Sequence, residues 1–232
     1  MLDIIWLGHG SFELKLASGE VFLIDPWVTG NPKYPPAHKI EKVDAILITH
    51  GHFDHTGDLI TLAKQFSAPV VAIHEIAVWL EGKGITTARG MNKGGTQQVG
   101  PVAVTMTHAL HSSSLMDNGQ IIYAGEAAGF VLTFSDGRTV YFAGDTSVFS
   151  DMALIEQLYK PELAFLPIGD HYTMGPREAA LACRLVKAKT IFPMHWGTFP
   201  ALTGTPEKLA DLLKGDGLFS IVRAEPGQTV NW

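Results

Sequence analysis

The sequence THGHFDHTGD at residues 49–58 places three histidines and an aspartate within six positions, as His50, His52, Asp54 and His55. It overlaps the end of DAILITH, a short apolar run that predicts a buried strand ending at His50. Ligating side chains must sit where the chain leaves a rigid element, because a metal fixes their distance and direction. The stretch therefore predicts a site at a strand end.

These residue types are metal ligands. Imidazole nitrogen and carboxylate oxygen bind zinc at about 2.0 to 2.2 Å. In an extended or turning segment, His50 and His52 point to the same side, whereas Asp54 and His55 turn toward a second position. Histidine-rich surface loops without a metal do occur, but the H-x-H-x-D-H pattern after an apolar strand favours metal binding.

Strand and helix patterns continue on both sides of this loop. Upstream, three apolar runs indicate a meander with a turn at residues 18–20, and the proline-rich and glycine-rich residues 30–43 indicate a surface loop. Downstream, a helical pattern follows Gly57, and residues 120–146 indicate three strands. The last third alternates again, with a helix from Pro176 through Val186. Two sets of strands, each with helices, predict one domain over residues 1–232, built as a four-layer α/β/β/α sandwich.

THGHFDH resembles the signature of the metallo-β-lactamase superfamily, and further motifs follow in the family's order over nearly the whole chain. ALHSSS resembles its third metal histidine, at His111. YFAGDTS resembles its metal-bridging aspartate, at Asp145, and PMHWGTF its last metal histidine, at His195. The segments LGHGSF and PIGDHYTMGP resemble most a bacterial group of metal-dependent hydrolases related to L-ascorbate-6-phosphate lactonase, and more distantly N-acylphosphatidylethanolamine phospholipase D. The resemblance implies the metallo-β-lactamase fold and hydrolase activity.

The resemblance also implies a pair of divalent metal ions. One ion would take His50, His52 and His111, the other Asp54, His55 and His195, and Asp145 would be shared. A set of histidines and aspartates without cysteine suits zinc, manganese, iron or nickel, with zinc as the first expectation.

His108 is an alternative to His111 as the third histidine, because both lie in THALHSSS. Alternation along the strand puts His108 on the same face as Val104 and Met106, which favours packing. His111 falls past the strand end, where ligands gather, and is the favoured ligand.

A shared metal-bound hydroxide would serve as nucleophile toward an ester, lactone or phosphoester, with Asp54 both ligating and orienting the attacking water. Protonation of the leaving group needs a further acid, for which His9, His171 and Tyr172 are candidates in that order. A supporting hydrogen-bonding role for His9 is equally compatible with its place between two glycines. Asp25 is expected to support a ligand rather than bind metal.

The charge balance disfavours nucleic acids and anionic membranes as partners. Seventeen basic residues against 23 acidic ones give a net charge of −6. We expect a small-molecule substrate, and assembly into a homo-oligomer is compatible with the sequence. The first ten residues lack a basic leader and their apolar run ends at Gly8, which predicts a cytoplasmic protein. The single cysteine, Cys183, is expected to be a buried thiol.

Two other function classes compete with hydrolysis. A di-iron redox protein of the same superfamily would use similar ligands, but such relatives usually carry an acidic residue at the position of His52 and an appended flavin domain. A non-catalytic, metal-stabilised binding module would not need all seven ligands.

Overall fold

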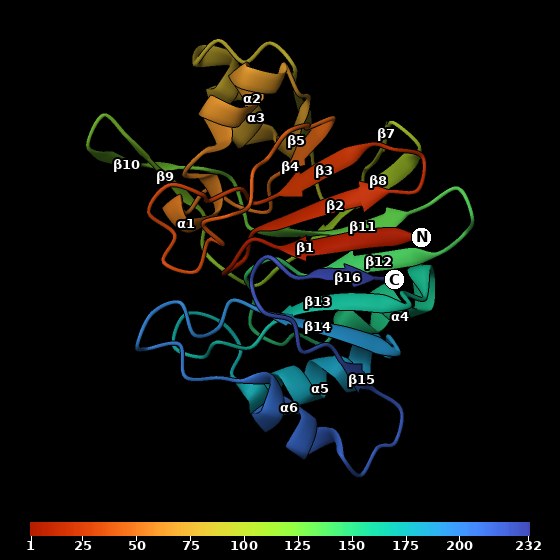
Figure 1. Ribbon diagram of the computed structural model, residues 1–232. Helices are drawn as coiled ribbons and strands as arrows, with labels where there is room; N and C mark the ends of the chain where they lie inside the picture. Colours follow the sequence, from red (N-terminus) through yellow and green to blue (C-terminus); the bar gives the residue numbers. More distant parts are fainter. The chain divides into compact units, whose positions relative to one another are not determined.

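The computed structural model describes residues 1–232, which form two compact units. Unit 1 comprises Met1–Gly95, Ser112–Ala127 and Ala224–Trp232, and unit 2 comprises Thr96–His111 and Ala128–Arg223. Each unit contains a mixed seven-stranded sheet (Figure 1). One domain over residues 1–232 stays a prediction.

The sheet of unit 1 has the strand order β16-β1-β2-β3-β4-β5-β6. β1, β2 and β3 form an antiparallel meander, and β3, β4, β5 and β6 run parallel to one another. The strands are β1 (Leu2–Trp6), β2 (Phe12–Leu16), β3 (Val21–Ile24), β4 (Ala45–Leu47), β5 (Val70–Ile73), β6 (Ala88–Met91) and β16 (Thr229–Asn231). The parallel part places the carboxyl ends of β3 and β4 at one edge, where loops can carry a site.

Three helices and a separate hairpin complete unit 1. The helices are α1 (Phe53–Thr56), α2 (Leu59–Phe66) and α3 (His74–Gly82), and the hairpin consists of β9 (Ser114–Asp117) and β10 (Gln120–Tyr123). α2 buries Leu59, Leu62 and Ala63, the residues that share one face at helical spacing. In Figure 1, α2 and α3 lie together near the β4 and β5 end of the sheet.

The sheet of unit 2 has the order β15-β14-β13-β12-β11-β8-β7. The neighbouring strands among β7, β8, β11 and β12 pair antiparallel, and β12, β13, β14 and β15 run parallel. The strands are β7 (Thr96–Val99), β8 (Val102–His108), β11 (Ala128–Thr133), β12 (Thr139–Phe142), β13 (Leu163–Pro167), β14 (Thr190–Met194) and β15 (Ser220–Ile221). The parallel strands β12 and β14 end just before Asp145 and His195.

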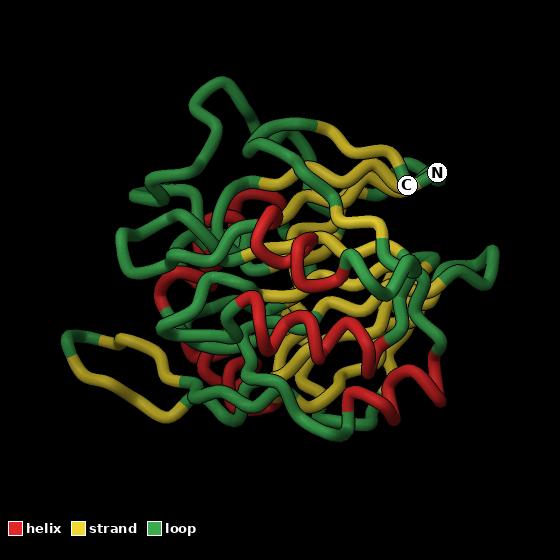
Figure 2. The backbone as a smooth tube through the Cα atoms, turned by 90° about the horizontal axis from the view of Figure 1, so that it is seen from below, coloured by secondary structure: helices red, strands yellow, loops and turns green.

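Helices cover one face of this second sheet. They are α4 (Met152–Tyr159), α5 (Pro176–Val186) and α6 (Pro206–Leu213). Apolar residues of all three, among them Ile155, Cys183 and Leu209, form one core with Tyr141 and Leu166 of the sheet. Figure 2 shows the helices as red coils beside the yellow strands. Burial raises the pKa of the Cys183 thiol to about 12, so the prediction of a buried structural thiol is confirmed.

Many predicted elements are confirmed. The turn at residues 18–20 has Gly19 at φ +99°, residues 30–43 contain no helix or strand, and α5 spans the predicted Pro176–Val186. Thr205 accepts a hydrogen bond from the backbone N–H of Lys208 at the start of α6. Two mixed sheets with helices packed on them agree with the predicted α/β class. No helix of the chain is long and apolar enough to cross a membrane.

The prediction missed several short elements. α3 starts directly after β5, with no cap or turn residue to announce it, and contains the weak helix formers Ile76, Val78 and Trp79. β6 and β7 lie in a polar, glycine-rich stretch that indicated irregular structure, and β9 lies in the serine-rich segment after His111. Tertiary pairing, rather than local propensity, determines all of these.

Candidate metal centre

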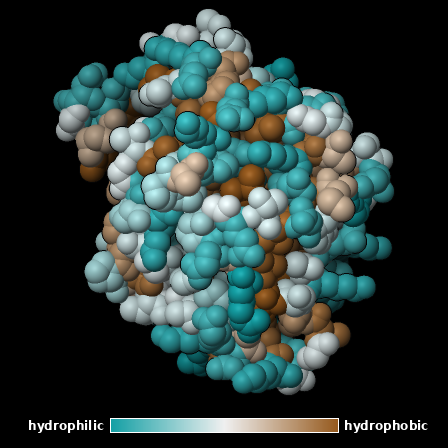
Figure 3. Space-filling model, viewed as in Figure 1, coloured by the Kyte–Doolittle hydropathy of each residue, from teal (hydrophilic) through white to brown (hydrophobic).

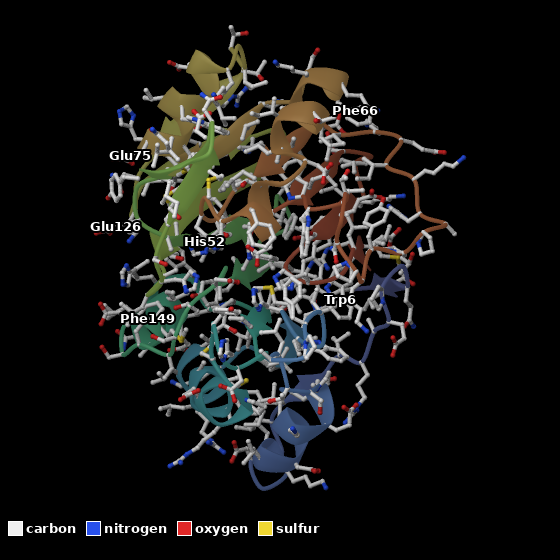
Figure 4. All side chains as sticks on the ribbon, turned by 90° about the vertical axis from the view of Figure 1, so that its left-hand side faces the viewer. Trp6, His52, Phe66, Glu75, Glu126 and Phe149 are labelled. Carbon is white, nitrogen blue, oxygen red and sulfur yellow. The ribbon has the colours of Figure 1, made fainter.

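The loop after β4 places four predicted ligands around one turn of helix. β4 ends at Leu47, so the predicted strand ending at His50 was three residues too long. His52 is the N-cap residue of α1, which contains Asp54 and His55. His50 and His55 are fully buried, whereas Asp54 and His52 are partly exposed; of the four, Figure 4 labels His52.

His50 and His52 converge. Nε2 of His50 lies 3.0 Å from Nδ1 of His52, and Nδ1 of His50 lies 3.0 Å from the Thr49 hydroxyl. Two nitrogens that bind one tetrahedral ion at about 2.0 to 2.1 Å lie roughly 3.3 Å apart. The two histidines thus have the separation that ligands of one ion require.

The buried Asp25 carboxylate fixes the His55 ring through its Nδ1 atom. The carboxylate of Asp25 accepts the backbone N–H of Thr49 at 2.8 Å and its hydroxyl at 2.6 Å, and Nδ1 of His55 lies 2.8 Å from Asp25 Oδ2. Complete burial raises the pKa of Asp25, and the neighbouring His55 lowers it in part. Because Nδ1 of His55 is engaged, Nε2 faces Asp54 Oδ2 at 3.9 Å. This agrees with the supporting role predicted for Asp25.

The His9 side chain contacts the Asp54 carboxylate. Its Nε2 lies 2.8 Å from Asp54 Oδ2, and its ring packs edge-on against Trp27. His9 sits in a tight turn at φ +58°, and Trp6 Nε1 donates a hydrogen bond to its carbonyl at 2.9 Å. A Cβ atom at Gly10 would lie 2.7 Å from His55 Cε1, so glycine at this position lets the turn approach the metal loop.

In unit 2, the predicted ligands gather at Asp145. Oδ2 of Asp145 lies 3.0 Å from Nε2 of His195 and 3.8 Å from Nε2 of His111. Asp145 and His195 are almost fully buried, and His111 is partly exposed. The structure thus brings together three residues that lie far apart in the sequence.

Loop contacts position these three side chains. Thr146 Oγ1 accepts the backbone N–H of Leu110, and the backbone N–H of Ser147 donates to the Leu110 carbonyl, which ties the His111 segment to the Asp145 loop. A Cβ atom at Gly169 would lie 1.9 Å from the carbonyl oxygen of His195. Only glycine therefore allows the loop after β13 to close on His195, which itself has φ +57°.

His108 and His111 lie in different surroundings. His111 approaches Asp145, whereas His108 is exposed at the end of β8 and packs edge-on against Phe149 at 5.1 Å between ring centroids. Burial of Val104 and Met106 on the same face was expected, but the predicted packing of His108 among them is wrong.

The segment with His171 and Tyr172 forms a tight, exposed loop. Asp170 and His171 both have positive φ, and the His171 and Tyr172 rings contact each other at 4.4 Å between centroids. Met174 of the same loop is buried in the core of unit 2, and its backbone N–H donates to the Thr146 carbonyl. The loop that carries His171 is thus attached to the loop that carries Asp145.

Sequence reasoning missed the residues that position the ligands. Ser113 Oγ accepts the backbone N–H of Gly51 at 3.1 Å, and Ser112 Oγ lies 3.4 Å from His52 Nε2. Thr49, Thr146 and Gly169 act similarly. Their signal was adjacency to a predicted ligand in sequence, but hydroxyl and glycine residues are too common for that signal to select them.

The donor chemistry of both clusters fits divalent metal ions. Buried imidazoles with one nitrogen held by a carboxylate or hydroxyl, as in His55 and His50, present the other nitrogen in the neutral form that binds a metal. Asp54 and Asp145 supply carboxylate oxygens next to these nitrogens. Several first-row divalent ions accept this set of nitrogen and oxygen ligands.

Comparison with known proteins supports the same chemistry. Residues 20–196 match the family model described as the beta-lactamase superfamily domain. The chain is 61% identical to a UPF0173 metal-dependent hydrolase of Solibacter usitatus, over all of both chains, and 51% identical to one of Koribacter versatilis, covering 98% of this chain and 97% of the relative. A solved metallo hydrolase of Ignicoccus hospitalis is 35% identical, with a TM-score of 0.87 over 99% of this chain and 97% of that chain.

Proposed function

Because the chain belongs to the UPF0173 family of metal-dependent hydrolases, with the metallo-β-lactamase fold, we propose that it hydrolyses a small ester, lactone or phosphoester with two divalent metal ions. Zinc is the first expectation, with manganese, nickel or iron as alternatives. The net charge of −6 favours a small molecule over nucleic acid, and bound cations would attract an anionic substrate locally.

The convergence of nitrogen and oxygen donors within each unit supports this proposal. In unit 1, His50 and His52 approach to 3.0 Å, and in unit 2, His195 and His111 lie around one oxygen of Asp145. We propose that both clusters contribute to one metal centre. The ligands would be His50, His52 and His111 for one ion, Asp54, His55 and His195 for the other, and Asp145 for both.

Metal ions bound there would lower the pKa of water from about 15.7 toward neutrality and so supply the nucleophile. The chain's own residues then control protons and orientation. Asp54 is held by His9 at 2.8 Å, and this contact fixes the carboxylate that would orient the attacking water. His9 is fully buried, so we propose that it positions Asp54 rather than touching the substrate.

The leaving group needs a proton donor that the substrate can reach. His171 and Tyr172 are exposed, in a loop attached to the Asp145 loop through the Met174–Thr146 hydrogen bond. We propose His171 as this donor, with Tyr172 as its alternative. Replacement of His171 by alanine should lower kcat for substrates with poor leaving groups and leave activated esters almost unaffected.

Metal analysis combined with turnover tests the function. Purified protein should contain about two equivalents of divalent metal by mass spectrometry, and metal-reconstituted protein should turn over at least one member of a panel of esters, lactones and phosphodiesters. The variant H50A should lose metal and turnover, whereas H74A, which alters an exposed histidine of α3, should keep both. Iron content with oxygen uptake would instead indicate redox chemistry, and full metal content without any turnover would indicate a binding module.

The role of His9 has a separate test. The variant H9A should retain its metal content and lower turnover about 10-fold, because Asp54 loses the hydrogen-bond partner that fixes its carboxylate. The variant H9Q, which can keep a hydrogen bond to Asp54, should recover part of the rate. An unchanged rate in H9A would remove His9 from the mechanism.

A further inference from the structure

The β9–β10 hairpin carries an exposed apolar face. Asn118 and Gly119 at its turn have φ +48° and +77°, which is the conformation of a two-residue type I′ turn. Met116, Ile121 and Tyr123 are 62%, 73% and 71% exposed. Met116 lies opposite Ile121, and Tyr123 follows two residues later, so all three share one face. Figure 3 shows brown, apolar atoms on the hairpin, at the upper left.

The other face of the hairpin is anchored to its own unit. Leu115 is buried, and Asp117 accepts hydrogen bonds from Trp79 Nε1 of α3 at 2.9 Å and from Nζ of Lys83, the residue after α3, at 2.7 Å. The Lys83 ammonium holds the pKa of Asp117 below its usual value. The hairpin is therefore held in place, and in Figures 1 and 2 it extends beyond the other elements of unit 1. Its apolar face points away from α3.

One edge of the hairpin is open. A two-residue turn makes Asp117 and Gln120 a hydrogen-bonded pair, so the alternation directs the backbone N–H and C=O of Ile121 and Tyr123 away from β9. β10 pairs with no strand other than β9. The opposite edge is covered at its base, because the Ser114 carbonyl lies against Gly51, where an added Cβ atom would come within 2.8 Å.

We propose that β10 pairs antiparallel with β10 of a second copy of this chain, across a two-fold axis at Ile122. In this register Ile121 of one copy lies opposite Tyr123 of the other, and the outward backbone groups of both residues form four hydrogen bonds. The pairing extends two hairpins into one four-stranded sheet. Its exposed face joins the Met116, Ile121 and Tyr123 side chains of both copies.

Charge and symmetry favour a second copy as the occupant. Two chains with net charge −6 repel each other, but residues 118–125 carry no charge, and Asp117 is already paired with Lys83. An aromatic residue opposite a β-branched one is a favourable cross-strand pair, and the two-fold axis forms it twice. Natural edge strands usually carry lysine, proline or a bulge against unwanted pairing, and β10 has none of these.

The size of the patch indicates a reversible dimer. The three exposed side chains present roughly 300 to 400 Å² of apolar surface, comparable to the largest patch on a typical monomer. A stable complex buries about 800 Å² per partner. The dimer should therefore dissociate on dilution rather than be obligate.

Sedimentation equilibrium over a range of protein concentrations tests the proposal, using purified protein with its metal content measured. Wild type should show a monomer–dimer equilibrium. The variant I121K should weaken dimerisation at least 10-fold. L218K, which alters an equally exposed leucine of unit 2, should leave it unchanged. Unchanged metal content in I121K would show that the fold is intact.

Paired charges test the register. The double variant I121K/Y123E places lysine opposite glutamate twice and should regain part of the affinity lost in I121K, whereas I121K/Y123K places like charges opposite each other and should abolish the dimer. A chain that is monomeric at all concentrations, or a dimer that tolerates I121K/Y123K, would overturn the proposal. These outcomes do not depend on whether the chain is a hydrolase.

Discussion

The two predicted ligand clusters are built in different ways. In unit 1, four of the ligands lie within six residues of one loop, and a single helical turn, α1, orients two of them. In unit 2, His111, Asp145 and His195 follow three different strands and meet only because the sheet aligns those strand ends. The first cluster is local in sequence, and the second depends on the tertiary structure of its unit.

Their means of support differ in the same way. In unit 1, the dedicated carboxylate of Asp25 fixes His55 through direct hydrogen bonds. In unit 2, the contacts are between loops, through Thr146 and Gly169. We therefore expect single substitutions of polar supporting residues to weaken metal binding at the first cluster. At the second cluster, we expect changes of backbone conformation at positions distant from the ligands in sequence to do so.

Removal of one ligand from either cluster should have the largest effect. H111A should lose metal and lower kcat/KM at least ~1,000-fold, because a metal contributes several kcal/mol of transition-state stabilisation. H108A, only three residues away, should keep both, since His108 packs on Phe149. Metal analysis and steady-state kinetics check this pair, and the reverse result would reassign the third histidine.

Loss of Asp25 should have a smaller effect, confined to the first cluster. D25N should weaken metal affinity about 10- to 100-fold, because His55 loses the partner that fixes its tautomer and ring. The matched control is E13Q, since Glu13 is another buried carboxylate of unit 1, bonded to His38, which is not a predicted ligand. Competition with a fluorescent chelator measures affinity, and equal losses in both variants would contradict the role given to Asp25.

A methyl group at Gly169 should affect the second cluster through the backbone. G169A places a Cβ atom against the carbonyl of His195, so we expect a loss of about 1 to 3 kcal/mol in the free energy of unfolding and weaker metal binding. Gly215, where an added Cβ meets nothing within 4 Å, provides the control G215A. Urea denaturation checks both, and equal stability of the two variants would contradict the loop-closure argument.

The smallest effect concerns the pH response of the hairpin. The hydrogen bond from Lys83 lowers the pKa of Asp117. The ionised carboxylate therefore stabilises the hairpin above the ordinary carboxyl pKa near 4, and this stabilisation is lost as the pH falls through the lowered pKa. The protection of β9 and β10 amides from exchange, relative to the rate of an unstructured chain at the same pH, should therefore fall below pH 4 in wild type. D117N should show low protection already at neutral pH. A difference in protection between the two proteins that stays the same below pH 4 would contradict this prediction.

Local patterning identified a large part of the molecule. The apolar runs of β1, β5, β8 and β13, the turn at Gly19 and the helix from Pro176 depend on side-chain periodicity and backbone preference, which act over a few residues. Short elements such as α1, α3 and β9 did not follow from local propensity, because pairing and packing with distant segments hold them.

The sequence alone identified the candidate metal ligands, because imidazole nitrogens and carboxylate oxygens that follow an apolar strand are the donors that metal ions bind, and it located the family signature at His50 to His55. Only the tertiary structure decided that His111 rather than His108 lies near Asp145, that Asp25 contacts His55 and His9 contacts Asp54, and that the hairpin exposes one apolar face. Contacts between residues far apart in the chain arise from strand alignment and loop closure, and no short stretch of sequence encodes those distances.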